Sequence, residues 1–134
     1  MKFMMMMHSP RTGWKDAGIG TWPVADIRAH IAFMVRFNQE LTESGEFVDA
    51  QGLALPDEAR VVRAAPASGE AVVTDGPFPE AKEFLAGFWI IDVESPERAH
   101  RIAARISAAP GKGGVPMNMP IEIRQVMSKP PEDL

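Results

Sequence analysis

Two acidic residues, Asp75 and Glu83, stand at the ends of a segment that the sequence predicts to lie between two strands. The segment cannot continue a β-ladder, because Pro77 has no N–H to donate and Gly76 tolerates a positive φ. Loops held by a rigid sheet are frequent places for binding and catalysis. We expect both carboxylates to face one cleft with a cation or histidine in reach, since partly buried carboxylates need a charge partner, donors or a proton. The alternative is structural: Asp75 caps a turn and Glu83 is solvated.

His8 is the candidate partner of these carboxylates, because histidine is the side chain most easily tuned for proton transfer near neutral pH. It ends the first predicted strand, where it could meet Asp75 at one end of the sheet. A carboxylate beside a histidine orients the ring and stabilises its charged form. The sequence therefore predicts catalytic roles for Asp75, His8 and Glu83. A strand-end His8 that is exposed to water or bonded to the backbone is the alternative.

Three further residues are candidates for binding a ligand: Arg124, His30 and Lys82. Arg124 belongs to the last predicted strand and could be the charge partner of the carboxylates. His30 borders the apolar stripe of the first predicted helix, and Lys82 precedes Glu83. His100 lies among charged residues on the second predicted helix, where we expect it to be solvated.

The sequence carries no signature of a metal site or an organic cofactor. It has no Cys, and the metal-binding spacings HxH, HxxxH and HExxH do not occur. Fingerprints for nucleotides and flavins and the GxSxG nucleophile elbow are also absent. The Gly-Lys-Gly-Gly run at 111–114 lacks the spacing of a phosphate-binding loop, and no predicted helix follows it. Any enzymatic activity is therefore expected to use acid–base chemistry, with no metal and no cofactor.

Two segments with the spacing of amphipathic helices must help to position these candidates. The first starts at Thr21, a good cap, before Pro23 and runs to about Glu43. The second opens on Ser95 as its cap, with Pro96 in the first turn. The predicted buried stripes are Val24, Ile27, Ile31, Met34 and Leu41, with Phe37 alongside, and then Ala99, Ile102, Ala103 and Ile106.

Apolar runs bounded by Gly and Pro predict the strands. A long loop is expected at 9–22 and a Gly- and Pro-rich loop at 112–120. The expected strands cover residues 2–8, 46–55, 59–65, 71–74, 88–93 and 121–127, with a hairpin turn at 66–69 and a frayed tail at 129–134.

The order strand, helix, strand, extra hairpin, strand, helix, strand is a ferredoxin-like α+β pattern with an inserted β-hairpin. No boundary divides residues 1–134, so we expect a single domain. Two helices can cover only one face of an antiparallel sheet, and the other face then needs a partner. The closing strands supply apolar side chains at Phe88, Ile90, Ile121, Ile123 and Met127. Homodimerisation, sheet against sheet, is the simplest way to bury that second face.

The stretch Asp75-Gly76-Pro77-Phe78, followed by Lys82-Glu83 and Gly87, resembles the signature of the YCII-related, or DGPF-domain, family of small bacterial proteins. Similarity to that family covers most of the chain. Its further parts are Met1-Lys2-Phe3-Met4 in the first strand, Glu40-Leu41 with Gly45 at the end of the first helix, Gln51-Gly52-Leu53 in the second strand, and Glu122-Ile123-Arg124 with Val126 in the last. The resemblance implies a dimeric α+β barrel with clefts between the helix layer, the sheet and the loops.

The resemblance also bears on function. Part of the wider family carries a helix histidine that is proposed to pair with an aspartate, but His30 lies 15 residues before Gly45, about one turn too early for that pattern. A few members of the broader family act on small cyclic compounds. DGPF-type proteins are often encoded near extracytoplasmic-function sigma factors, which implies a regulatory role.

Net charge and the absence of targeting patterns argue against some classes of function. The net charge of −4 argues against a nucleic-acid-binding surface. No N-terminal signal pattern and no apolar run of about 18 residues occurs, so we expect a cytoplasmic protein without a membrane partner. The first functional hypothesis is a regulatory module that binds a small molecule or a partner protein. The alternative is a cofactor-independent acid–base enzyme, lyase- or isomerase-like, that acts on a small cyclic or anionic compound through Asp75 and a histidine.

Overall fold

The computed structural model describes residues 1–13, 15, 18–65, 67, 69–78 and 80–127. The frayed tail expected at 129–134, and the turn residues Pro66 and Ser68, lie outside the described residues. The elements are β1 (Lys2–Pro10), η1 (Ile19–Thr21), α2 (Val24–Glu43), β2 (Phe47–Gly52), η2 (Pro56–Glu58), β3 (Arg60–Arg63), β4 (Val72–Asp75), β5 (Glu83–Asp92), α3 (Pro96–Ser107), η3 (Lys112–Gly114) and β6 (Ile121–Gln125).

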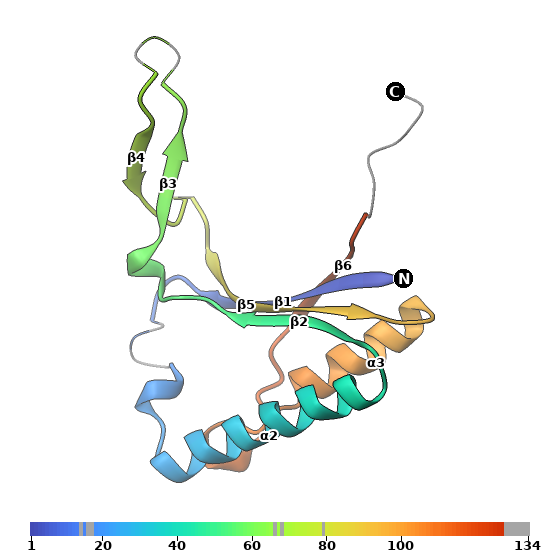
Figure 1. The fold of residues 1–134 in the computed structure, drawn as a ribbon. Coiled ribbons are helices and arrows are strands. Elements are labelled where there is room, and N and C mark those ends of the chain that lie inside the picture. Colours follow the sequence, from blue (N-terminus) through green and yellow to red (C-terminus); the bar gives the residue numbers. More distant parts are fainter. Residues whose placement is uncertain (14, 16–17, 66, 68, 79, 128–134) are drawn as a thin grey trace, which may run out of the picture.

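The main sheet has four antiparallel strands in the order β2-β5-β1-β6. Helices α2 and α3 cover one of its faces (Figure 1). This confirms the ferredoxin-like α+β prediction, and the sheet is not closed into a barrel within the chain. The inserted hairpin is also confirmed: β3 and β4 form a separate two-stranded sheet. The hairpin stands away from the main sheet, on the side opposite the helices (Figure 1).

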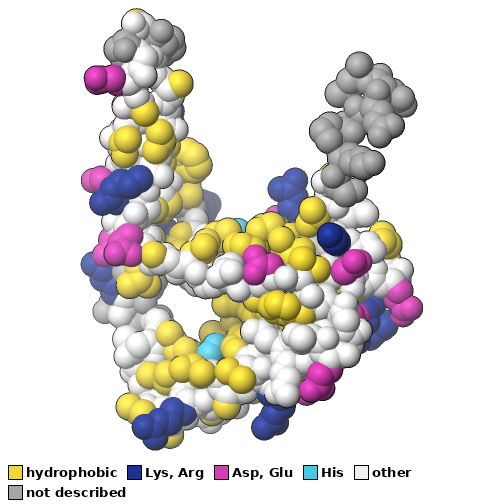
Figure 2. Space-filling model, viewed as in Figure 1, with side chains coloured by type: hydrophobic (Ala, Val, Ile, Leu, Met, Phe, Trp, Pro, Cys, Tyr) yellow, Lys and Arg dark blue, Asp and Glu magenta, His cyan; other side chains and the backbone are white. Residues whose placement is uncertain are grey.

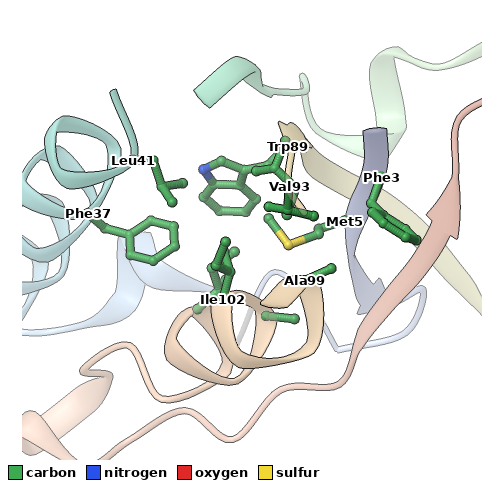
Figure 3. Close-up of a cluster of buried hydrophobic side chains, with 11 residues drawn as sticks. Phe3, Met5, Phe37, Leu41, Trp89, Val93, Ala99 and Ile102 are labelled. Carbon is green, nitrogen blue, oxygen red and sulfur yellow. The ribbon is translucent and has the colours of Figure 1, made fainter. Parts of the chain in front are cut away.

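The hydrophobic core fills the space between the sheet and the two helices. Met5 from β1, Ile91 from β5 and Ile102 from α3 are fully buried there. Side chains from α2, α3 and the sheet point into one cluster (Figure 3). The indole of Trp89 packs edge-on against the Phe37 ring and donates a hydrogen bond to Asn38 Oδ1 at 2.8 Å, so its one polar group is satisfied.

The opposite face of the sheet is also apolar at its centre. Successive side chains of a strand point to opposite faces. Met5 and Ile91 point to the helices, and Met4 and Ile90, which pair across β1 and β5, therefore point away from them. Met6 and Phe88 form the next such pair. Hydrophobic side chains gather on this open face beside the hairpin (Figure 2).

The prediction for the second helix is confirmed, and that for the first needs correction. Ser95 caps α3 by accepting a hydrogen bond from the N–H of Arg98, and the predicted stripe of α3 is buried. Thr21 does not cap α2, because the helix begins later and the hydroxyl of Thr21 instead donates to Gly18 O at 2.7 Å. Val24 and Ile31 of the predicted stripe are exposed, because the buried side of α2 is the side that carries Phe37 and Leu41, with Phe33 and Met34 packed against the core.

The strands at the hairpin end of the sheet are longer than predicted. β1 continues into the expected loop as far as Pro10, which pairs with Glu83, the first residue of β5. Each extension supplies hydrogen-bonding partners for the other. Glu83 is therefore held by a strand, at the point where the sheet meets the hairpin connection.

Candidate functional site

A polar cleft lies at the end of the sheet where β1 finishes and where β5 and β6 begin. It has a volume of about 530 Å³ and is lined by His8, Lys82, Glu83, Pro120, Ile121 and Glu122. Three of these residues were candidates on sequence grounds: His8, Lys82 and Glu83. The structure brings these three together with Glu122, which sequence reasoning did not single out as a functional residue.

The position of His8 depends on an irregularity in the pairing of β1 with β5. Met7 lies opposite Gly87 and His8 lies opposite Leu85, so β5 contributes one extra residue at this point. Such bulges bend a strand, increase its twist and redirect side chains near functional sites. On the other side of β1, Met6 pairs with Glu122 of β6. His8 and Glu122 consequently reach each other on the open face.

The imidazole of His8 and the carboxylate of Glu122 form a direct pair. His8 Nε2 lies 3.0 Å from Glu122 Oε1, and the two side chains are 29 % and 53 % exposed. When Nε2 carries the proton and donates to the carboxylate, Nδ1 of the neutral ring is an acceptor. The pair therefore has the carboxylate–imidazole arrangement used in proton transfer, with Glu122 in the place expected for Asp75.

Lys82 and Glu83 are positioned by Arg11, just beyond the end of β1. The Arg11 N–H donates to the carbonyl of Lys82 at 2.9 Å, and its guanidinium Nη1 donates to the carbonyl of Phe78 at 2.9 Å. These bonds fasten the hairpin connection to the sheet. The charged side chains of Lys82 and Glu83 are exposed at the mouth of the cleft.

Asp75 does not join this cleft, so the expectation that its carboxylate and that of Glu83 face one site is wrong. Its side chain is 94 % exposed and lies 3.6 Å from Arg60 Nε. Asp75 ends β4, where its pairing partner in the hairpin ladder is Arg60. Because the hairpin stands away from the sheet, the side chain is carried away from His8, whose observed partner is Glu122.

Gly76 is explained by close packing. Gly76 does not use its tolerance of a positive φ, since it is not among the residues with that conformation. A Cβ on Gly76 would lie 3.3 Å from the backbone carbon of Ala59 and from Val61 Cγ2. The Gly76 N–H also donates to Ala59 O at 2.9 Å, and the Gly76–Pro77 peptide is cis. The motif around Asp75 thus packs the root of the hairpin.

The other candidates divide between the two faces of the sheet. Arg124 lies on the open face, opposite Met4 and two residues beyond Glu122 along β6. His30 lies in the helix layer: its Nδ1 is 3.0 Å from Pro110 O, and its ring packs edge-on against Trp22. A ring nitrogen bonded to a carbonyl must carry a proton, so Pro110 determines the tautomer of His30. His30 is therefore placed as a packing residue, remote from the His8 cleft.

The role of Glu122 could have been suspected from the alternation of the last strand. Ile121 and Ile123 face the core, not the second face that the sequence suggested for them, and the residue between them must face the other way. What the sequence does not contain is the pairing of that strand with the first one, which brings together two residues 114 positions apart.

Two further properties concern the described part of the chain. It contains no group of three or more His, Cys, Asp or Glu residues arranged to hold a metal ion. No helix within it has the length and apolarity needed to cross a membrane.

Comparison with known families adds one finding. The family model of the YCII-related domain matches residues 1–121, which include the hairpin, both helices and the cleft residues except Glu122. A search of curated proteins finds no match.

Proposed function

The chain belongs to the YCII-related domain family, and from this premise we propose that it is a regulatory module whose polar cleft binds a small molecule. The observation that supports this proposal is the convergence of His8, Lys82, Glu83 and Glu122 on one cleft. Small-molecule sites combine a concave surface of about 300–1,000 Å³ with a few convergent polar groups. The cleft has that size and supplies both charges as well as an imidazole.

A second copy of the chain is part of the proposal. The open face carries Met4, Phe88 and Ile90 at its centre, each partly buried, and the second face of an apolar sheet needs a partner to cover it. Arg124 and Asp49 lie on opposite edges of this face, so two sheets related by a two-fold axis can bring unlike charges together. The cleft opens beside this face, and a partner would enclose it further. The regulatory assignment, and its link to sigma factors, is supported by the family resemblance.

Retention of metabolites tests the binding function. Immobilised protein is incubated with a bacterial metabolite extract, washed and denatured, and the released small molecules are identified by mass spectrometry. We expect the wild type to retain compounds that the His8→Gln and Glu122→Gln variants lose. His100→Gln, on the exposed side of α3, is the matched control and should retain them. Equal retention by all four proteins would contradict a site at this cleft.

The His8–Glu122 pair specifically favours a second candidate, a cofactor-independent acid–base enzyme acting on a small cyclic compound. In that case His8 would take and return a proton, Glu122 would orient the imidazole, and Glu83 or Lys82 would bind the substrate. Incubating each retained compound with the protein in D₂O and following its NMR signals separates the two functions. Deuterium incorporation or product formation that slows about 100-fold in His8→Gln would identify an enzyme. Unchanged compound would identify a binding module.

A further inference from the structure

A second pocket adjoins the polar cleft, at the root of the hairpin. It has a volume of about 420 Å³, and its walls come from the segment after β2, the hairpin connection and the first residues of β5. Glu83 lines both this pocket and the polar cleft, so the two hollows are neighbours at this residue. The nearby Arg11 fastens one wall by donating a hydrogen bond to Phe78 O at 2.9 Å. The wall that contains Phe78 is therefore fastened to the end of β1.

The walls of this root pocket are apolar. They include Leu53, Leu55, Phe78, Phe84 and Leu85. Leu53, Leu55 and Phe78 are 45 %, 55 % and 59 % exposed, so three large apolar side chains are left in water around one hollow. Exposed apolar surface that is concentrated in this way marks a binding site more often than scattered residues do. An aromatic ring or a short branched chain is the complementary occupant.

The charged residues that line the root pocket, Glu58 and Glu83, are both acidic. The guanidinium of Arg11 lies at the wall, where it donates hydrogen bonds to the carbonyls of Phe78 and Ala81 at 2.9 and 3.5 Å. The polar cleft adds Glu122, with Lys82 as its basic residue. A ligand with a carboxylate or phosphate would bring a negative charge beside Glu58 and Glu83, which like-charge repulsion disfavours. An ammonium group would make charge-assisted hydrogen bonds to a carboxylate at the same place.

We infer that the two hollows together bind one amphiphilic amine, whose apolar group enters the root pocket and whose ammonium group pairs with Glu83. This inference rests on the proposed small-molecule function and gives that function a ligand class. It also replaces the anionic class considered for this site on sequence grounds with a cationic one. The polar end of the ligand extends toward His8 and Glu122, where donors and acceptors can select among amines.

Three probes of one shape and different charge test this inference. They are 2-phenylethylamine, 2-phenylethanol and 3-phenylpropionate, each titrated into ¹⁵N-labelled protein at neutral pH. Binding is read from the amide shifts of residues 53–55 and 83–85. We expect saturable shifts with the amine, at least about tenfold weaker binding of the alcohol, and no saturation with the acid, because only the amine forms an ion pair with Glu83.

Matched variants locate the binding groups. Glu83→Gln should weaken amine binding about tenfold and bring it to the level of the alcohol, whereas Glu97→Gln, at the start of α3, should leave it unchanged. Phe78→Ala should weaken both amine and alcohol, and Val115→Ala, an equally exposed apolar site elsewhere, should weaken neither. Circular dichroism confirms that each variant is folded.

The outcomes also separate this inference from the broader function. Equal or tighter binding of 3-phenylpropionate, or no binding of the amine, would overturn the inference. If the metabolite experiment then still retained compounds in a His8- and Glu122-dependent way, the polar cleft would stand as a binding site with a different ligand. Loss of both results would remove the proposed function as well.

Discussion

The two faces of the main sheet are built from the same strands but have different surroundings. On the covered face, Met5 and Ile91 are sealed by α2 and α3. On the open face, Met4 and Ile90 occupy the neighbouring positions, and none of the described helices lies above them (Figure 1). The covered face carries the hydrophobic core, and the open face carries the polar cleft. The sheet thus carries the core on one face and leaves the other for the binding site and the partner that we propose.

The polar pairs of the two faces differ in their number of hydrogen bonds and in the exposure of the carboxylate. Beside the covered face, Arg98 donates two hydrogen bonds to the Glu46 carboxylate, at 2.8 and 2.7 Å, and Glu46 is only 15 % exposed. On the open face, His8 and Glu122 share one contact and Glu122 is 53 % exposed. We therefore expect the Glu46–Arg98 pair to stabilise the fold and the His8–Glu122 pair to act on ligands.

Truncating two adjacent isoleucines, one on each face, should give the largest difference in the free energy of unfolding. Ile91→Ala removes a fully buried side chain from the core and should lower the free energy of unfolding by about 3 kcal/mol. Ile90→Ala, one residue earlier on the open face, should cost about 1 kcal/mol in the dissociated chain. Urea denaturation at low protein concentration measures both. Equal losses would contradict the division of the two faces.

A charge on the open face tests the proposed dimer. Wild-type protein should sediment at twice the chain mass of 14.7 kDa. Ile90→Asp should weaken dimerisation by about 100-fold or more, because association would bury an unpaired carboxylate. Ile31→Asp, on the exposed surface of α2, is the control and should remain dimeric. A wild type that sediments as a monomer at micromolar concentration would remove the face-to-face model.

Two glycines that face each other across β2 and β5 should respond differently to substitution. A Cβ on Gly87 would lie 2.9 Å from the carbonyl oxygen of Gln51, whereas a Cβ on Gly52 would meet nothing within 4 Å. Gly87→Ala should therefore lower the free energy of unfolding by about 2 kcal/mol through overpacking. Gly52→Ala should change it by less than about 0.5 kcal/mol. Thermal unfolding of the two variants ranks them, and a larger effect at Gly52 would refute the packing argument.

The smallest expected effect is the difference in stabilisation between the Glu46–Arg98 pair and the His8–Glu122 pair. Hydrogen bonds from Arg98 hold the pKa of Glu46 below its ordinary value. The stabilisation is therefore complete above the ordinary glutamate pKa of about 4.3 and is lost as the pH falls through the lower value of the folded state.

At neutral pH, Glu46→Gln should cost about 1.5 kcal/mol, and Glu122→Gln should cost less than about 0.5 kcal/mol. The difference between wild type and Glu46→Gln should shrink in acid below about pH 4. Urea unfolding across pH measures it, and a pH-independent difference would show that the ion pair is not its source.

Much of the fold could be predicted because its signals are local. The stripe Ala99, Ile102 and Ile106 and the Ser95-Pro96 start describe α3 almost completely, since capping and a 3.6-residue period act within a few turns. The first half of α2 shows the limit of this reasoning. Val24 and Ile31 belong to the same predicted stripe as Leu41, yet of the three only Leu41 is buried. The core covers the side of the helix on which Phe37 lies, and at about 100° per residue Ile31 is turned about 120° away from Phe37.

Several residues of the candidate site could be predicted one by one, but their arrangement in space could not. His8 and Glu83 were recognised from their chemistry and their place beside strands. Asp75 has the same chemistry, but the direction of the hairpin carries it away from the cleft. Glu122 was missed because its partner lies at the other end of the chain.

The sequence by itself determined the order of strands and helices, the family, and which side chains could take part in proton transfer or ion pairing. These properties depend on residue type and on neighbours within a few positions. Only the tertiary structure decided that His8 meets Glu122, that Glu83 stands between two hollows, and that the Asp75 motif packs the root of the hairpin. The reason is that a local pattern indicates the face on which a side chain lies, whereas the choice of pairing strands and the angle of the hairpin depend on contacts between residues far apart in the sequence.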